Sequence, residues 1–61
     1  MITNETKRKI VEKMVRRLWG NEEAANAWWN HNNFSFKMTP NEMWNRNPSI
    51  VTNYVVEIFF K

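Results

Sequence analysis

Apolar residues recur at helical spacing over the first third of the chain. Between Thr3 and Trp19 they are separated by one, three and four positions, at Ile10, Val11, Met14, Val15 and Leu18. This spacing places them along one face of a helix. Gly20, the only glycine, follows directly. It is predicted to end the helix, because glycine adopts the left-handed conformation of a helix C-terminus without steric cost.

A second helix is predicted immediately after this turn. Asn21 can cap its first free N–H groups, and Glu22 and Glu23 place negative charge in its first turn, as the helix dipole favours. Small and aromatic residues continue it through Ala24, Ala25, Ala27 and Trp28. The run Asn30-His31-Asn32-Asn33 is predicted to break it, because short amide side chains compete for backbone hydrogen bonds and tolerate turns.

The segment Met38-Thr39-Pro40-Asn41-Glu42-Met43 contains every element of a helix start. Thr39 can cap the first N–H groups and Glu42 can reach back to the N–H of the cap, with the two methionines placed for a hydrophobic staple. Pro40 has its φ angle preset for the first helical position. A third helix is therefore predicted from Pro40 to about Arg46. Because its start is fixed, the loop before it is expected to be held in a defined position.

Asn47-Pro48-Ser49 repeats this order of cap and proline, so the third helix ends there and a fourth begins. The following segment, Ile50 to Phe60, is rich in β-branched and aromatic residues, which propensity alone would allow as a strand. Strand-like alternation fails at Val55-Val56 and at Phe59-Phe60, whereas helical spacing holds. We expect a helix whose apolar stripe comprises Ile50, Val51, Tyr54, Val55, Ile58 and Phe59.

Together these segments predict an all-α fold, a small single-domain bundle of about four short helices over residues 1–61. A chain of 61 residues removes only about 60% of its unfolded surface on folding, so its core is small. It has no cysteine, so no disulfide can staple it. Tight packing of its four tryptophans and four phenylalanines, or association with another chain, must supply stability instead.

The composition lacks the parts of an active site. There is no aspartate and only one histidine, His31, which leaves Ser35 and Ser49 without the partners of a nucleophile. A single glycine cannot form a phosphate-cradling loop, and one histidine without cysteine or aspartate cannot build a zinc site within one chain. We predict a protein that is not an enzyme and that holds no metal and no cofactor.

The apolar runs are only a few residues long, too short for a spanning helix, and the N-terminal residues lack the apolar core of a signal peptide. The absence of cysteine fits a reducing compartment. We therefore expect a cytoplasmic protein without a membrane partner.

Positive charge is concentrated in the first predicted helix. Six of the nine positive residues fall there, mostly opposite the apolar stripe: Lys7, Arg8, Lys9, Lys13, Arg16 and Arg17. Such a face is either an ordinary solvated one or a contact for a nucleic-acid backbone or an acidic protein surface, with Lys9, Lys13, Arg16 and Arg17 as the candidate nucleic-acid contacts. A membrane-surface helix is a weaker third possibility, because the narrow apolar stripe is needed for the core. The net charge of +3 is small and no separate recognition helix is evident. The solvated face is preferred, and nucleic-acid binding is the alternative.

The chain has more aromatic residues than four short helices can bury. Trp28 and Trp29 are neighbours whose side chains diverge by about 100°, so only one can be central in the core. We expect Trp28, Phe36 and Tyr54 to pack in the core. Exposed aromatic residues near positive charge are typical of protein-binding hot spots. The predicted partner-binding residues are Trp29, His31, Phe34, Phe36, Lys37, Trp44 and Phe60.

Residues in all four predicted helices and in the intervening loop resemble the toxin-binding domain of the Xre/MbcA/ParS antitoxin family. The resemblance covers residues 15–58 and rests on Leu18-Trp19-Gly20, Ala24, Ala25, Ala27, Trp28, Asn33, Phe36, Thr39-Pro40, Glu42, Pro48, Val51, Tyr54 and Val55. It implies a short all-helical domain. In family antitoxins this domain binds a RES-type toxin and blocks its NAD-consuming site, and small stand-alone copies look like proteins found on bacteriophage genomes. The resemblance thus implies a location in the cytoplasm of a bacterial cell or a phage-infected host.

The predicted function is thus a non-enzymatic, antitoxin-like protein-binding module of a bacterium or its bacteriophage. We expect it to dock on a partner protein, a toxin or a host protein, through the loop from His31 to Lys37 and the neighbouring Trp29 and Trp44. Two alternatives stay open. One is a small basic nucleic-acid-binding protein that uses the first helix. The other is a homo-oligomeric or phage structural subunit whose surplus aromatic residues bury against copies of the same chain.

Overall fold

The computed structural model describes residues 3–61, so Met1 and Ile2 of the predicted 1–61 domain lie outside the described residues. Four helices follow one another: α1 (Asn4–Trp19), α2 (Glu22–Asn30), α3 (Pro40–Arg46) and α4 (Pro48–Phe59). Residues 3–61 contain no β-strand, only one isolated bridge between Asn33 and Met38. The predicted all-α bundle of four short helices is confirmed.

Each helix begins where the sequence supplies a cap. The Thr3 hydroxyl and the Asn21 amide oxygen each accept a hydrogen bond from the N–H three residues on, at 3.1 and 2.7 Å. Thr39 and Glu42 form the complete capping box at the start of α3. Asn47 follows the last residue of α3, and its side chain accepts from the second residue of α4 at 3.2 Å. The predicted caps Asn21, Thr39 and Asn47 therefore fix three helix starts, and Thr3, a cap that was not predicted, fixes the fourth.

The two helix-to-helix turns without a loop depend on special backbone residues. Gly20 ends α1 with a φ angle of 95°, and its N–H donates to the carbonyl of Arg16 at 2.8 Å. Pro48 occupies the first position of α4, where its missing N–H removes no helical hydrogen bond. Within residues 3–61, the one long connection between helices therefore lies between α2 and α3.

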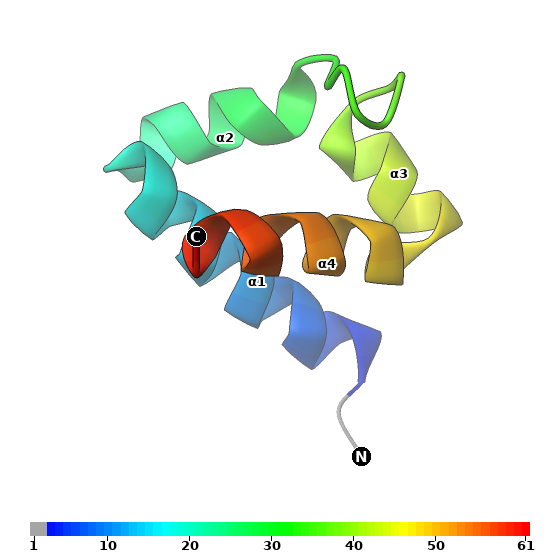
Figure 1. Cartoon of the computed structure of the whole chain (residues 1–61), viewed down its shortest axis with the longest axis horizontal. Coiled ribbons are helices and arrows are strands. Elements are labelled where there is room, and N and C mark those ends of the chain that lie inside the picture. Colours follow the sequence, from blue (N-terminus) through cyan, green and yellow to red (C-terminus); the bar gives the residue numbers. More distant parts are fainter. Residues whose placement is uncertain (1–2) are drawn as a thin grey trace.

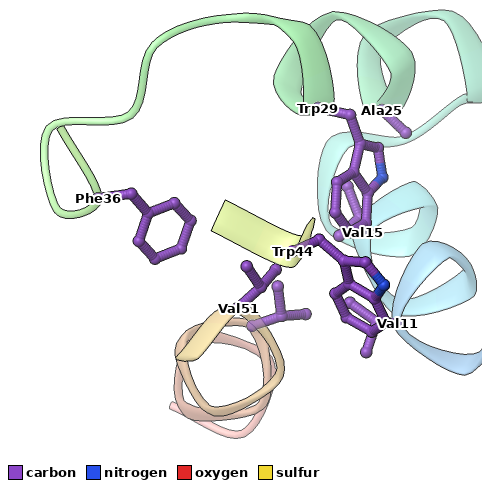
Figure 2. Packing of buried hydrophobic residues seen from close by; sticks show 8 residues of the cluster. Val11, Val15, Ala25, Trp29, Phe36, Trp44 and Val51 are labelled. Atoms are coloured by element: carbon purple, nitrogen blue, oxygen red, sulfur yellow. The ribbon is translucent and has the colours of Figure 1, made fainter. Parts of the chain in front are cut away.

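The four helices enclose one core. α1 packs on α2 and α4, and α3 packs on α2 and α4, with α4 lying in front of α1 in the view of Figure 1. Within residues 3–61, the buried core residues come from every helix and from the loop: Val11, Val15, Ala25, Trp29, Phe36, Trp44, Val51 and Val55. Figure 2 shows Trp29 and Trp44 reaching toward the α1 valines, while Phe36 points inward from the loop.

Two residues of the predicted stripes, Ile10 and Ile50, are exposed. Ile10 is 47% exposed and Ile50 is 44% exposed. Each precedes a fully buried valine, Val11 or Val51, by one position, so its side chain is rotated by about 100° from the centre of the buried face. The valines occupy that centre, and the isoleucines remain at its edge.

Candidate functional site

The loop of residues 31–39 joins α2 to α3 and is held by its own backbone (Figure 1). Asn33 organises it. Its N–H donates to the carbonyl of Met38 at 2.9 Å, and its carbonyl accepts from Phe36 and Lys37 at 3.1 and 2.8 Å. Its side-chain oxygen also accepts from the N–H of Ser35 at 2.8 Å, as in an Asx turn. We refer to residues 31–39 as the 31–39 loop.

Two phenylalanines of this loop have opposite surroundings. Phe36 is 5% exposed and packs edge-on against Tyr54 of α4, with ring centroids 5.0 Å apart. Phe34, two residues earlier, is 101% exposed, as fully as in an extended chain. Phe36 therefore anchors the loop to the core, and Phe34 presents a complete aromatic ring to the surroundings.

Lys37 adopts a strained backbone conformation between these features and α3. Its φ angle is 60°, and it is the only residue other than glycine with a positive φ among residues 3–61. An L-residue in this left-handed region is disfavoured by contact between its Cβ and the following carbonyl. The strain persists because the hydrogen bonds to Asn33 and the helix start at Thr39 fix both sides of the residue.

Arg8 of α1 links three helices. Its guanidinium carbon lies 3.7 Å from the ring centroid of Trp29 in α2 and 5.3 Å from that of Trp44 in α3. Its Nε donates to Oε2 of Glu12 at 2.9 Å, and its Nη2 donates to Oδ1 of Asn41 at 2.6 Å. A planar guanidinium satisfies both the ring face and the directional acceptors, which a lysine ammonium would not do equally well.

The contacts of Arg8 extend to the two helix ends that flank the 31–39 loop, which we call the stem of the loop. Asn41, in the first turn of α3, donates from Nδ2 to Oδ1 of Asn30, the last residue of α2, at 3.0 Å. Asn30 donates in turn to the carbonyl of Asn26 at 2.8 Å. The two amides thus join the helix ends on either side of the 31–39 loop. We call the following residues the Arg8 cluster: Arg8, Glu12, Trp29, Asn30, Asn41 and Trp44.

The expectation that Trp29 and Trp44 form part of a docking surface is wrong. They are 3% and 8% exposed, and their rings pack edge to face with centroids 6.1 Å apart. Phe36, expected both in the core and in the binding set, is in the core alone. Trp29 takes the central position because the small Ala25, one turn earlier, leaves room beside the α1 valines. Trp28 is only half-buried and lies at the edge of the core, with its ring near those of Trp19 and Tyr54.

The remaining predicted partner-binding residues are accessible but do not form one surface. His31, Phe34 and Lys37 are exposed in the 31–39 loop. Phe60 is 76% exposed at the C-terminal cap of α4, with its ring against Phe59. In Figure 1 that end of α4 lies near the turn from α1 to α2, on the opposite side of the molecule from the loop.

The predicted nucleic-acid contacts are also divided. Lys9, Lys13 and Arg16 line a hollow between α1 and α2, whereas Arg17 is exposed elsewhere on α1. Arg8, assigned by its charge to the basic face, instead lies against Trp29. The position of Arg8 in the sequence could have indicated this contact. Arg8 precedes the buried Val11 and Val15 by three and seven residues, which places it at the edge of the helix face that they form.

Among residues 3–61, no group of three or more His, Cys, Asp or Glu side chains could hold a metal ion. The described helices are also too short and too polar for any of them to cross a membrane. Comparison of the chain with protein-family models, with curated proteins and with solved structures finds no match. The functional inference therefore rests on the residues and their arrangement.

Proposed function

We propose that the chain is a non-enzymatic protein-binding module that docks through the 31–39 loop, with Phe34 as its anchor. The observation that carries this proposal is the full exposure of the Phe34 ring on a loop that is otherwise held by hydrogen bonds and by a buried neighbour. A large apolar side chain displayed in this way is typical of an interface anchor.

Burial of the Phe34 ring supplies free energy for binding. Removing a phenylalanine side chain from water stabilises a complex by about 1.5–3 kcal/mol. The loop is ordered before binding by the Asn33 hydrogen bonds, the Phe36 anchor and the Asn30–Asn41 stem. Less conformational entropy is therefore lost on association, so more of this free energy remains as affinity.

The surroundings of Phe34 define the chemistry of its partner. Asn32, Asn33, Phe34 and Lys37 border an open hollow of about 320 Å³. The amides can donate to and accept from a partner's backbone, and Lys37 favours an acidic group at the rim. A partner surface with an apolar pocket for one ring and a carboxylate beside it fits this arrangement.

In its family-based form, the proposal is that the chain is an antitoxin-like inhibitor in the bacterial cytoplasm, from a bacterium or its bacteriophage. The loop would then cover the NAD-consuming site of a RES-type toxin. The resemblance through Thr39, Pro40 and Glu42 supports this form, because these residues build the helix start that fixes the end of the 31–39 loop.

Photo-crosslinking from position 34 tests the proposal. The chain is produced in bacteria with p-benzoylphenylalanine in place of Phe34 and is irradiated in the cells, and the adducts are identified by mass spectrometry. We expect a distinct protein adduct. The purified partner should then bind Phe34→Ala roughly thirtyfold more weakly than the original chain in calorimetry, since truncation of an interface anchor costs about 2 kcal/mol or more.

Two controls make the result specific. The crosslinker at Asn53, an exposed position on α4, should give none of the adduct, and Phe60→Ala, which removes another exposed phenylalanine, should leave the affinity unchanged. Equal crosslinking from both positions, or equal affinity of Phe34→Ala and the original chain, would contradict the proposal. A crosslinked dimer would favour self-association, and a nuclease-sensitive complex would favour nucleic-acid binding.

A further inference from the structure

A second candidate site lies between α1 and α2, outside the 31–39 loop. It is a hollow of about 330 Å³, near the lower end of the range for ligand pockets. Ala25 and Trp29, both buried, contribute to its lining, as do the exposed Glu22 and Asn26 of α2. The wall from α1 carries three cations, Lys9, Lys13 and Arg16, together with Glu12.

The charges of this hollow are unevenly compensated. Glu12 is already paired with Arg8 at 2.9 Å. Within residues 3–61, none of Lys9, Lys13 and Arg16 forms an ion pair. Glu22 alone faces three unpaired cations, so the hollow attracts negative charge.

The cations are spaced along the hollow. Lys9 and Lys13 are four residues apart on α1, a rise of about 6 Å along the helix axis. Alternate residues of an extended peptide are about 6.6 Å apart and point to the same side. Two acidic side chains at alternate positions of an extended segment therefore match the two lysines, and Arg16 extends the row by three residues.

The opposite wall favours a peptide over a nucleic-acid strand. Glu22 can accept hydrogen bonds from peptide N–H groups, and the Asn26 amide can both donate to and accept from a peptide backbone. A phosphodiester backbone carries no N–H donor for Glu22, whereas a peptide backbone does. We propose that this hollow binds an extended acidic segment of a protein, with carboxylates at alternate positions against Lys9 and Lys13.

This site is independent of the docking proposed for Phe34, because the two hollows share no residue. It is tested with a synthetic peptide, acetyl-Glu-Ala-Glu-Ala-Glu-amide, titrated into the ¹⁵N-labelled chain at low salt. We expect shifts of the amides of Ala25 and Asn26 and of the Trp29 indole N–H. Lys13→Glu should weaken binding about tenfold, since it places like charges opposite each other, and raised salt should weaken it too.

Control variants and a control peptide test whether binding depends on charge within this hollow. Lys37→Glu makes the same charge change outside the hollow and should retain the affinity, and the glutamine version of the peptide should not bind. Lys13→Gln, which adds no negative charge, should give an intermediate loss if Lys13→Glu disturbs the helix. Equal binding of both peptides, or equal loss in Lys13→Glu and Lys37→Glu, would overturn the proposal. Binding of a ten-nucleotide oligothymidylate in place of the acidic peptide would overturn it in favour of nucleic acid.

Discussion

The Arg8 cluster and the 31–39 loop use the same aromatic chemistry in opposite ways. In the cluster, Trp29 and Trp44 are almost completely buried, and a guanidinium covers the face of one ring at 3.7 Å. In the loop, Phe34 has no such cover and is fully exposed. The two regions are connected, because the Asn30–Asn41 hydrogen bond belongs to the cluster and closes the stem of the loop.

This contrast separates stability from recognition within one small domain. Residues of the cluster contact three helices, so their removal is expected to affect folding. Phe34 contacts no other ring within residues 3–61, and its removal is expected to affect only what the loop binds. A residue's surroundings, and not its aromatic type, therefore decide which of the two properties it serves.

The largest expected difference between the regions comes from shortening one aromatic residue in each. Trp29→Ala should lower the free energy of unfolding by about 3–5 kcal/mol, the range for a large aromatic side chain removed from a core. A domain of this size has about as much stability in total. We therefore expect the variant to lose its helical circular dichroism signal at 25 °C.

Phe34→Ala is the matched variant on the exposed side. It should unfold within about 0.5 kcal/mol of the original chain in urea, as is usual for surface substitutions. If Trp29→Ala kept a cooperative transition at nearly the same urea concentration as Phe34→Ala, the division between a structural cluster and an exposed loop would be refuted.

A smaller effect is expected when the link between the regions is broken. Arg8→Met keeps much of the side-chain volume but removes the cation over Trp29 and the hydrogen bond to Asn41. We expect the free energy of unfolding to fall by about 2 kcal/mol, from the lost cation–π contact and charged hydrogen bonds. Amide hydrogen exchange at Phe36 and Lys37 should also accelerate, because the stem of the loop loses its support.

Glu12→Gln separates these effects from loss of the surface ion pair. Glu12 is 48% exposed in its side chain, and such a pair contributes at most about 1 kcal/mol. Its loss should leave exchange in the loop unchanged. Identical stability and exchange in Arg8→Met and Glu12→Gln would show that Arg8 acts only as a surface charge.

Most of the fold was predictable because its signals are local. Gly20, Asn21, Thr39 and Asn47 act on their own helix ends, and the structure places each cap as predicted. It was harder to predict from the sequence which individual aromatic residues are buried. Trp28 and Trp29 are neighbours of identical type, and only the position of α2 against α1 decides which of them is central.

Only part of the candidate site could be predicted, because only part of it depends on local sequence signals. The amide-rich run that ends at Asn33 and the capping box at Thr39 locate the 31–39 loop in the sequence. The role of Arg8 depends on contacts with Asn41 and Trp44, more than thirty residues away. Local spacing places Arg8 beside the apolar face but cannot identify those partners.

The smallest expected effect concerns the strain held within the loop itself. Lys37 has a φ angle of 60°, which glycine adopts freely and which asparagine tolerates better than lysine. Lys37→Gly should raise the free energy of unfolding by roughly 0.5 kcal/mol, since relief of the strain exceeds the added entropy of the unfolded chain. Lys37→Gln removes the charge without relieving the strain and should leave stability unchanged, and Lys37→Asn should fall between the two in urea denaturation. Equal stability of the glycine and glutamine variants would mean that the left-handed conformation carries no strain, and the loop would then differ from the Arg8 cluster in exposure alone.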